Sequence, residues 1–229
     1  MPHAQIIRAV VWDLDDTLYP ERQYVRSGYA AVGRHLRAAL GTAEAYEGWL
    51  WRRFEGGRFD RAFDALIEHF GLAGRGPAVG ELVRVYREHV PDIRPHEGVP
   101  ALLERLRGRG LRLGLLSDGY LPAQRLKLQA LGLDAWFDAV VFTEDLGREA
   151  WKPSAAGFEA VRERLGVEGT ACAYVGDNPG KDFVAPNALG WRTVQYVRAG
   201  QLYAGVAAPP GGGAQWVVRG DAECLAALR

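Results

Sequence analysis

The segment IIRAVVWDLDDT, residues 6–17, runs from an apolar stretch directly into a cluster of acids. Its first half, Ile6 to Val11, is apolar apart from Arg8. A short apolar run of this kind is typical of a strand that is buried on both faces in a parallel sheet. We therefore expect Asp13 and Asp15 at the carboxyl end of this strand, with both side chains on one face if the strand continues through them.

Beyond about residue 98, short apolar segments alternate with segments of helical periodicity. The predicted strands are 111–116, 139–142, 171–175, 192–197 and 215–218, and the predicted helices are 100–109, 121–131, 154–165, 182–189 and one from 221. Such alternation is typical of parallel strands that are joined by right-handed connections through helices. The predicted fold class is α/β, with a doubly wound, mainly parallel, Rossmann-like sheet.

The stretch between residues 20 and 95 has a different pattern. Apolar residues recur there at helical spacing, glycines interrupt them, and no strand is predicted. Because this block lies between the first strand and the next helix, we expect an all-helical insert on the rim of the sheet. The predicted domains are an α/β core over 1–19 and 96–229 and a small all-helical insert over 20–95.

The composition excludes several classes of protein. The 28 basic and 28 acidic residues give a formal net charge of +0, so no positive field attracts nucleic acid or anionic lipid. No run is apolar enough to span a membrane, and the polar start does not resemble a signal peptide. Cys172 and Cys224 build no disulfide framework and suit a reducing compartment. We expect a cytoplasmic monomer or homodimer without nucleic-acid or membrane partners.

Chemically active side chains also follow the later strands. They are Ser117 after the second strand, Lys152 in the loop after the third, and Asp177 and Asp182 after the fourth. Ligands of open parallel sheets bind beyond the carboxyl ends of the strands. Carboxylates that converge there repel one another, and an oxygen-preferring divalent cation removes the conflict. Mg²⁺ fits best, because it binds few carboxylates, keeps water ligands and accepts phosphate oxygens.

A set of hydrogen-bond donors of the right size for a phosphate accompanies these acids. It consists of the Ser117 hydroxyl, the backbone amides of Asp118 and Gly119, and the Lys152 ammonium. Acids, a cation and these donors point to phosphoryl transfer, in which one carboxylate attacks phosphorus and another moves a proton. Hydrolysis of phosphate monoesters is among the slowest uncatalysed reactions, so it needs charge neutralisation as well as a nucleophile.

Four segments, in order, carry a resemblance to the haloacid dehalogenase superfamily of hydrolases. They are DLDDTL at 13–18, LLSDG at 115–119, KP at 152–153 and VGDNPGKD at 175–182. The resemblance covers the whole chain. It implies that the helical block over 20–95 is a cap domain, inserted after the first strand.

The resemblance also implies a role for each matched residue. Asp13 would be the nucleophile and Asp15 the general acid/base of a phosphatase that hydrolyses a small phosphorylated metabolite through an aspartyl-phosphate. Ser117 and Lys152 would hold the phosphate. The implied Mg²⁺ ligands are the carboxylates of Asp13 and Asp177 and the main-chain carbonyl of Asp15, with Asp182 binding directly or through water.

Two features of the sequence depart from expectation. Asp118 stands where the family motif more often has a small or amide residue, so we expect its side chain to point away from the phosphate or to reach the leaving group. Only three of the 28 basic residues are lysine, namely Lys127, Lys152 and Lys181. We interpret Lys181 as a surface charge or as a charge outside direct contact with the substrate.

Three alternatives share the fold. A phosphomutase would pass the same intermediate to a sugar hydroxyl, and nothing at the strand ends separates it from a phosphatase. A dehalogenase needs the carboxylate nucleophile but neither a metal nor an acid at position 15. A non-catalytic binding protein would keep the fold without turnover.

Overall fold

The computed structural model describes residues 6–229 and contains one six-stranded sheet in the order β3-β2-β1-β4-β5-β6. Its strands are β1 (Ala9–Trp12), β2 (Arg112–Ser117), β3 (Ala139–Phe142), β4 (Cys172–Gly176), β5 (Arg192–Tyr196) and β6 (Trp216–Val218). Every neighbouring pair is parallel. The strand order reverses at β1, which lies between β2 and β4, so this is the point where a doubly wound sheet binds ligands. The predicted fold class is confirmed.

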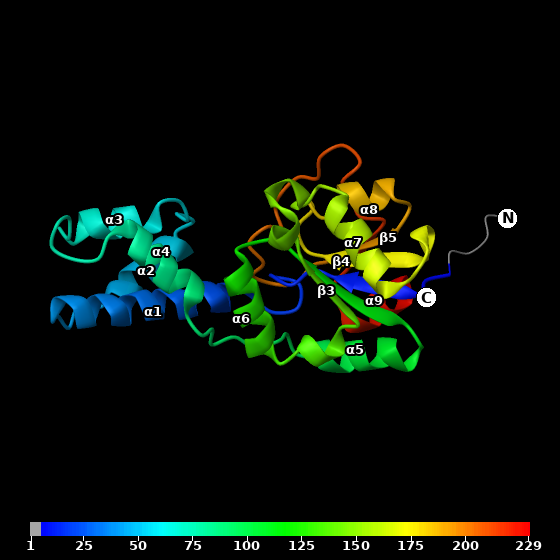
Figure 1. The fold of residues 1–229 in the computed structure, drawn as a ribbon, viewed down its shortest axis with the longest axis horizontal. Coiled ribbons are helices and arrows are strands. Elements are labelled where there is room, and N and C mark those ends of the chain that lie inside the picture. The colour runs from blue at the N-terminus through cyan, green and yellow to red at the C-terminus, as the bar shows by residue number, and fades with distance from the viewer. Residues whose placement is uncertain (1–5) are drawn as a thin grey trace. The chain divides into compact units, whose positions relative to one another are not determined.

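Helices cover both faces of the sheet (Figure 1). They are α5 (Val99–Gly108), α6 (Leu121–Leu131), α7 (Ala156–Leu165), α8 (Val184–Ala188) and α9 (Asp221–Ala227). Buried residues of α7 and α8 join those of β1, β2, β3 and β4 in one apolar core on one face. On the other face, α5 contacts β2, and α9 contacts α5 and β5. The sheet is therefore buried on both sides, as the continuous apolar strands predict.

Phe158 on α7 anchors the core on the first of these faces. Its side chain is fully buried, and its ring centroid lies 4.9 Å from that of Tyr174 and 5.7 Å from that of Trp191, both in edge-on arrangement. Truncation of an aromatic side chain in such contacts costs the protein both the burial of apolar surface and the attraction between the rings.

We expect Phe158→Ala to lower the free energy of unfolding by about 3–5 kcal/mol, because truncation leaves a cavity in the core. Denaturant unfolding, followed by circular dichroism, measures this change. Glu159→Ala, at the next and exposed position of the helix, is the control and should change the value by less than about 0.5 kcal/mol. A loss below about 1 kcal/mol for Phe158→Ala would show that neighbouring side chains collapse into the space.

Residues 23–93 form a second compact unit, separate from the unit of the described residues 6–22 and 94–229. This second unit contains most of α1 (Glu21–Leu40) and all of α2 (Tyr46–Glu55), α3 (Ala62–His69) and α4 (Val79–Glu88). The rings of Phe54, Phe63 and Tyr86 surround Tyr29, each with its centroid within 6.4 Å. The aromatic side chains thus pack the helices together. That this unit acts as a cap over 20–95 stays a prediction.

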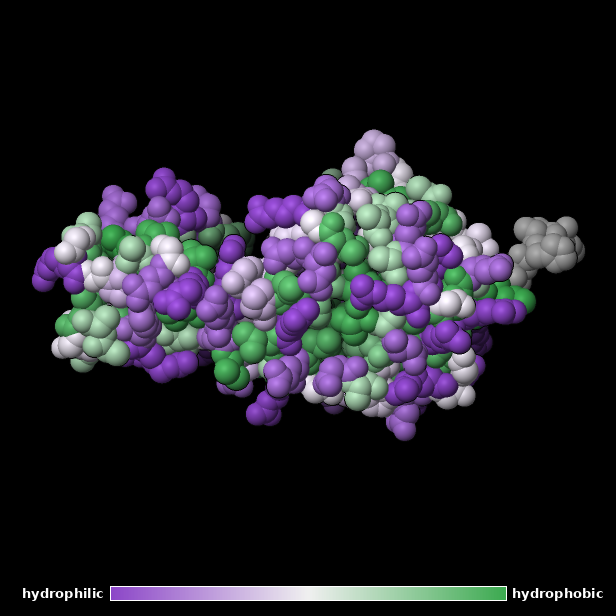
Figure 2. Space-filling model, viewed as in Figure 1, coloured by the Kyte–Doolittle hydropathy of each residue, from purple (hydrophilic) through white to green (hydrophobic). Residues whose placement is uncertain are grey.

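The surface and the helices bear on possible membrane contact. Within residues 6–229, none combines the length and the apolar character that crossing a membrane requires. Figure 2 shows hydrophilic and hydrophobic residues interspersed on the displayed face of each unit. The cytoplasmic location, the lack of nucleic-acid or membrane partners and the choice between monomer and homodimer stay predictions.

Candidate active site

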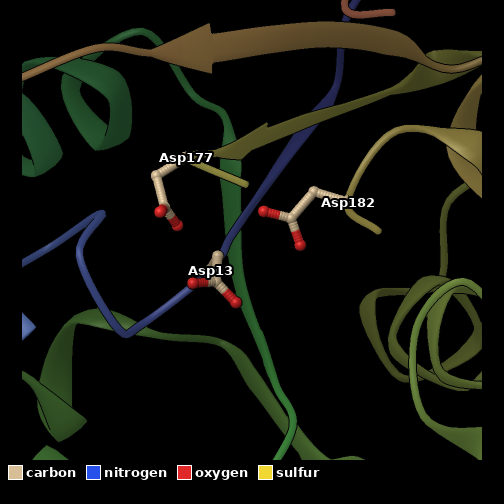
Figure 3. Close-up of side chains that lie close together, drawn as sticks. All are labelled: Asp13, Asp177 and Asp182. Atoms are coloured by element: carbon tan, nitrogen blue, oxygen red, sulfur yellow. The ribbon is translucent and has the colours of Figure 1, made fainter. Parts of the chain in front are cut away.

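Three acids converge where β1 and β4 end side by side. Asp13 directly follows β1, Asp177 directly follows β4, and Asp182 lies in the loop before α8. All three are buried, and one carboxylate oxygen from each lies within 4.8 Å of the others. Figure 3 shows the three carboxylates facing one another. Parallel strands that neighbour each other bring these distant segments together, as the sequence predicts.

Asp182 differs from its predicted place in a helix over 182–189. The helix begins at Val184, and Asp182 stays in the loop, where its Oδ2 accepts the backbone N–H of Asn178 at 2.9 Å. This local hydrogen bond competes with helix formation. It also turns the second oxygen of Asp182 toward Lys152, whose Nζ lies 2.8 Å away.

The electrostatics of the three acids favour a cation. Burial raises the pKa of Asp13 to about 7, while Lys152 lowers it and Asp182 raises it further. Burial, followed by the charges of Asp13 and Asp182, holds the pKa of Asp177 well above its usual value. Oδ1 of Asp177 accepts the Thr17 hydroxyl at 3.2 Å, but its Oδ2 is buried without a hydrogen-bond partner among the residues that the structure describes. An all-oxygen, acidic site with an unpaired buried oxygen suits a hard divalent cation.

Lys152 places a positive charge beside these acids. Its fully buried Nζ donates to Oδ1 of Asp13 at 2.5 Å and to the hydroxyl of Tyr174 at 2.9 Å. Burial lowers the pKa of Lys152, but the charges of Asp13 and Asp182 raise it more, so the pKa lies well above the usual value. Lys152 is therefore an ammonium, which can attract an anion at Asp13.

Ser117 and Gly119 follow at the same edge of the sheet. Ser117 is the last residue of β2 and is buried. Its Oγ accepts a hydrogen bond from Nε2 of Gln124 at 3.0 Å. Gly119 has φ of 128°, and a Cβ there would lie 2.8 Å from Nε2 of Gln124. This backbone conformation favours glycine, and a Cβ would also have to displace the amide end of the Gln124 side chain.

The Asp15 carboxylate is not among the three that converge. Because β1 ends at Trp12, the strand does not continue through Asp13 and Asp15, so the condition for a shared strand face is not met. The chain turns here instead, with φ of 54° at Asp16, a left-handed conformation that aspartate tolerates better than most residues. Oδ1 and Oδ2 of Asp16 hold this turn by accepting the N–H groups of Glu21 and Leu202, each at 2.7 Å.

The turn brings the Asp15 carboxylate to helix α6. Nζ of Lys127 donates to its two oxygens at 2.8 and 3.0 Å, Nε2 of Gln124 donates at 2.9 Å, and the Tyr19 hydroxyl donates as well. Burial raises the pKa of Asp15, but the Lys127 charge and these hydrogen bonds outweigh it and hold the pKa below its usual value. Asp15 is therefore a carboxylate in this structure.

Two charged residues at the site, Lys127 and Glu21, belong to none of the sequence motifs. Lysine is rare in this chain, which makes Lys127 unusual, but its rarity does not indicate which acid it contacts. Glu21, in the first turn of α1, has no such distinguishing feature in the sequence. Burial and the charge of Asp15 raise the pKa of Glu21 to about 8, with Lys127 acting in the opposite direction.

Asp118 and Lys181 form an ion pair. Nζ of Lys181 lies 3.0 Å from Oδ2 of Asp118, so the Asp118 carboxylate is directed to a cation of the protein. Lys181, interpreted from the sequence as a surface charge or a charge outside direct contact with the substrate, therefore has a defined partner in Asp118. All three lysines of the chain thus pair with acids of the candidate site.

Comparisons with known proteins agree with this arrangement. A model of haloacid dehalogenase-like hydrolases matches residues 7–190. The glyceraldehyde 3-phosphate phosphatase of Methanopyrus kandleri is 32% identical over 201 residues, which cover 84% of this chain and 85% of the relative. The structure of a HAD phosphatase from Thermococcus onnurineus is 27% identical, with a TM-score of 0.61 and coverage of 97% and 98% of the two chains.

A further solved structure is similar in fold. YfnB of Bacillus subtilis, a HAD hydrolase solved with magnesium bound, has a TM-score of 0.67, with 21% identity and coverage of 97% of this chain and 99% of YfnB. The family model spans most of the chain, and the four motifs meet at one end of the sheet. The chain therefore belongs to the haloacid dehalogenase-like hydrolases.

Proposed function

We propose that this protein is a Mg²⁺-dependent phosphatase that hydrolyses a small phosphorylated metabolite through an aspartyl-phosphate on Asp13, with Asp15 as general acid/base. The observation that carries the proposal is the three-acid cluster, which suits a cation, directly beside the Lys152 ammonium, which suits an anion. The relative from Methanopyrus kandleri, named a phosphatase, supports the same activity.

The residues at the cluster fit a magnesium ion. Carboxylate oxygens of Asp13 and Asp177 would hold it together with the main-chain carbonyl of Asp15, and Asp182 would bind directly or through water. When bound, Mg²⁺ would supply positive charge that offsets the buried acids and the phosphate oxygens. On the other side of the phosphate, the Ser117 hydroxyl, the amides of Asp118 and Gly119 and the Lys152 ammonium would donate to its oxygens.

The proposed reaction has two steps. In the first, which starts with Asp15 protonated, a carboxylate oxygen of Asp13 bonds to phosphorus, the bond from phosphorus to the ester oxygen breaks, and Asp15 gives its proton to the departing alkoxide. In the second, water bonds to phosphorus, Asp15 takes the water proton, and the bond from phosphorus to Asp13 breaks. Inorganic phosphate leaves, and both side chains return to their starting forms.

A dehalogenase fits the site less well. Removal of a halide through Asp13 needs neither a cation nor an acid at position 15. A dehalogenase mechanism would therefore use neither the three-acid cluster nor the hydrogen-bonded Asp15 carboxylate. A phosphomutase would use the same residues as a phosphatase, and only its products would differ.

The proposal is tested by screening the full chain against a panel of phosphorylated metabolites and sugar phosphates. We expect release of inorganic phosphate that requires Mg²⁺ and stops with EDTA. Isomerised sugar phosphates would identify a mutase instead, and halide release from a 2-haloacid in the presence of EDTA would identify a dehalogenase. No turnover of any compound with Mg²⁺ present would favour a binding protein.

Asp177→Asn is expected to weaken Mg²⁺ binding by at least about tenfold, because the amide loses the charge and one oxygen of a buried ligand. Isothermal titration calorimetry of Mg²⁺ measures this effect without requiring turnover. Glu163→Gln, at an exposed position of α7, removes one negative charge from the surface and is the control. An unchanged Mg²⁺ affinity in Asp177→Asn would refute the assignment of this residue as a metal ligand.

A further inference from the structure

The ion pair of Asp118 and Lys181 joins two loops of the site that lie 63 residues apart in sequence. Asp118 follows Ser117 directly after β2, and Lys181 precedes Asp182 in the loop after β4. The Asp118 side chain is 5% exposed and that of Lys181 is 37% exposed. The Asp118 carboxylate is therefore buried in the site, while the Lys181 side chain is partly exposed to solvent.

The second oxygen of Asp118 anchors a third loop. Oδ1 accepts the Thr143 hydroxyl at 2.9 Å and the backbone N–H of Lys152 at 3.2 Å. The ammonium of the same Lys152 contacts the proposed nucleophile, Asp13. The Asp118 carboxylate therefore helps to fix the backbone from which this ammonium reaches Asp13.

This anchor introduces an electrostatic conflict. Burial raises the pKa of Asp118, but the charges of Lys152 and Lys181 and the hydrogen bonds to its oxygens lower it more, so the side chain is a carboxylate. A carboxylate next to Ser117 repels any phosphate that Ser117 binds. Nζ of Lys181 donates to Oδ2 of Asp118, the oxygen that accepts no hydrogen bond from Thr143 or Lys152. The positive charge of Lys181 therefore offsets this repulsion.

We propose that Asp118 and Lys181 act as one positioning unit for phosphate, in which Asp118 holds the Lys152 loop and Lys181 cancels the charge that Asp118 sets against the phosphate. This inference rests on the proposed function, because it takes a phosphate group as the ligand. An uncharged amide at position 118 would offer the same oxygen acceptor without the charge. Lys181 is thus required only because position 118 is acidic.

The inference predicts that the effects of the two residues are coupled. In Lys181→Met, Asp118 keeps its negative charge but loses its cationic partner. The affinity for phosphate should therefore fall by about tenfold or more, which corresponds to about 1.4 kcal/mol of binding free energy. In the double variant Asp118→Asn with Lys181→Met, the amide still accepts from Thr143 and Lys152, and no charge remains to be cancelled. The double variant should therefore recover most of the affinity that Lys181→Met loses.

The experiment measures binding of inorganic phosphate by calorimetry, with Mg²⁺ present, to the wild type, both single variants and the double variant. Lys181→Arg, which keeps the charge, is the conservative variant and should retain phosphate affinity better than Lys181→Met. Arg125→Met is the control, because Arg125 forms an exposed ion pair with Asp145 at 3.6 Å, outside the site. Melting temperatures show that each variant is folded.

Two results would overturn the inference. A double variant that binds phosphate as weakly as Lys181→Met would show that Lys181 contacts phosphate itself. Wild-type affinity in Lys181→Met would show that the pair has no part in phosphate binding. Because calorimetry needs no turnover, failure of the proposed activity would appear separately, as a wild-type protein that binds phosphate but hydrolyses no ester.

Discussion

Asp13→Asn is expected to reduce phosphate release by about 10⁴-fold or more, the scale found when an enzyme loses its nucleophile. Asparagine has almost the same shape as aspartate, so it preserves packing in a position that is only 5% exposed. Its amide oxygen carries no negative charge and does not form a phosphorylated intermediate. The change also removes one charge from the three-acid cluster, so rates must be measured at saturating Mg²⁺.

The measurement is the turnover rate on the best substrate from the panel, together with trapping of phosphoenzyme by acid quench. We expect the wild type to form a phosphoenzyme that is stable to acid, and Asp13→Asn to form none. Asp134→Asn, an exposed acid in the same unit, should behave as the wild type does. If Asp13→Asn kept a tenth of the activity, the nucleophile would be a different residue.

The sequence could predict the meeting of Asp13 and Asp177 because backbone topology alone determines where they lie. In a parallel sheet all strands end at the same edge, so Asp13 after β1 and Asp177 after β4 need only neighbouring strands to become close. No side-chain detail enters this argument. Ser117 at the end of β2, on the other side of β1, follows from the same rule.

The sequence could not predict the partners of Lys127 and Lys181. Lys127 projects from α6, and its meeting with Asp15 depends on how that helix packs and on the left-handed turn at Asp16. Periodicity shows which face of a helix is apolar but not which acid a buried ammonium reaches. The scarcity of lysine identified unusual residues, and three-dimensional placement was needed to give them partners.

Asp15 illustrates the same limit, since its motif predicts proton transfer but not the environment that controls it. Lys127, Gln124 and Tyr19 together hold both carboxylate oxygens. In this state Asp15 is ready to accept a proton, as the second step of the proposed reaction requires. A phosphate dianion bound nearby would favour protonation of Asp15 by like-charge repulsion, which is what the first step requires.

Asp15→Asn is therefore expected to lower kcat/KM for an alkyl phosphate by about 10²-fold or more, because asparagine cannot protonate the leaving alkoxide. The effect on p-nitrophenyl phosphate should be clearly smaller, since nitrophenolate leaves without a proton. The quantity kcat/KM reports the step in which the leaving group departs, so comparing the two substrates isolates the role of Asp15 as an acid. Asp145→Asn, at an exposed position, is the matched control. An equal loss of kcat/KM on both substrates would contradict the assignment of Asp15 as general acid and would leave it a role in orienting neighbouring groups.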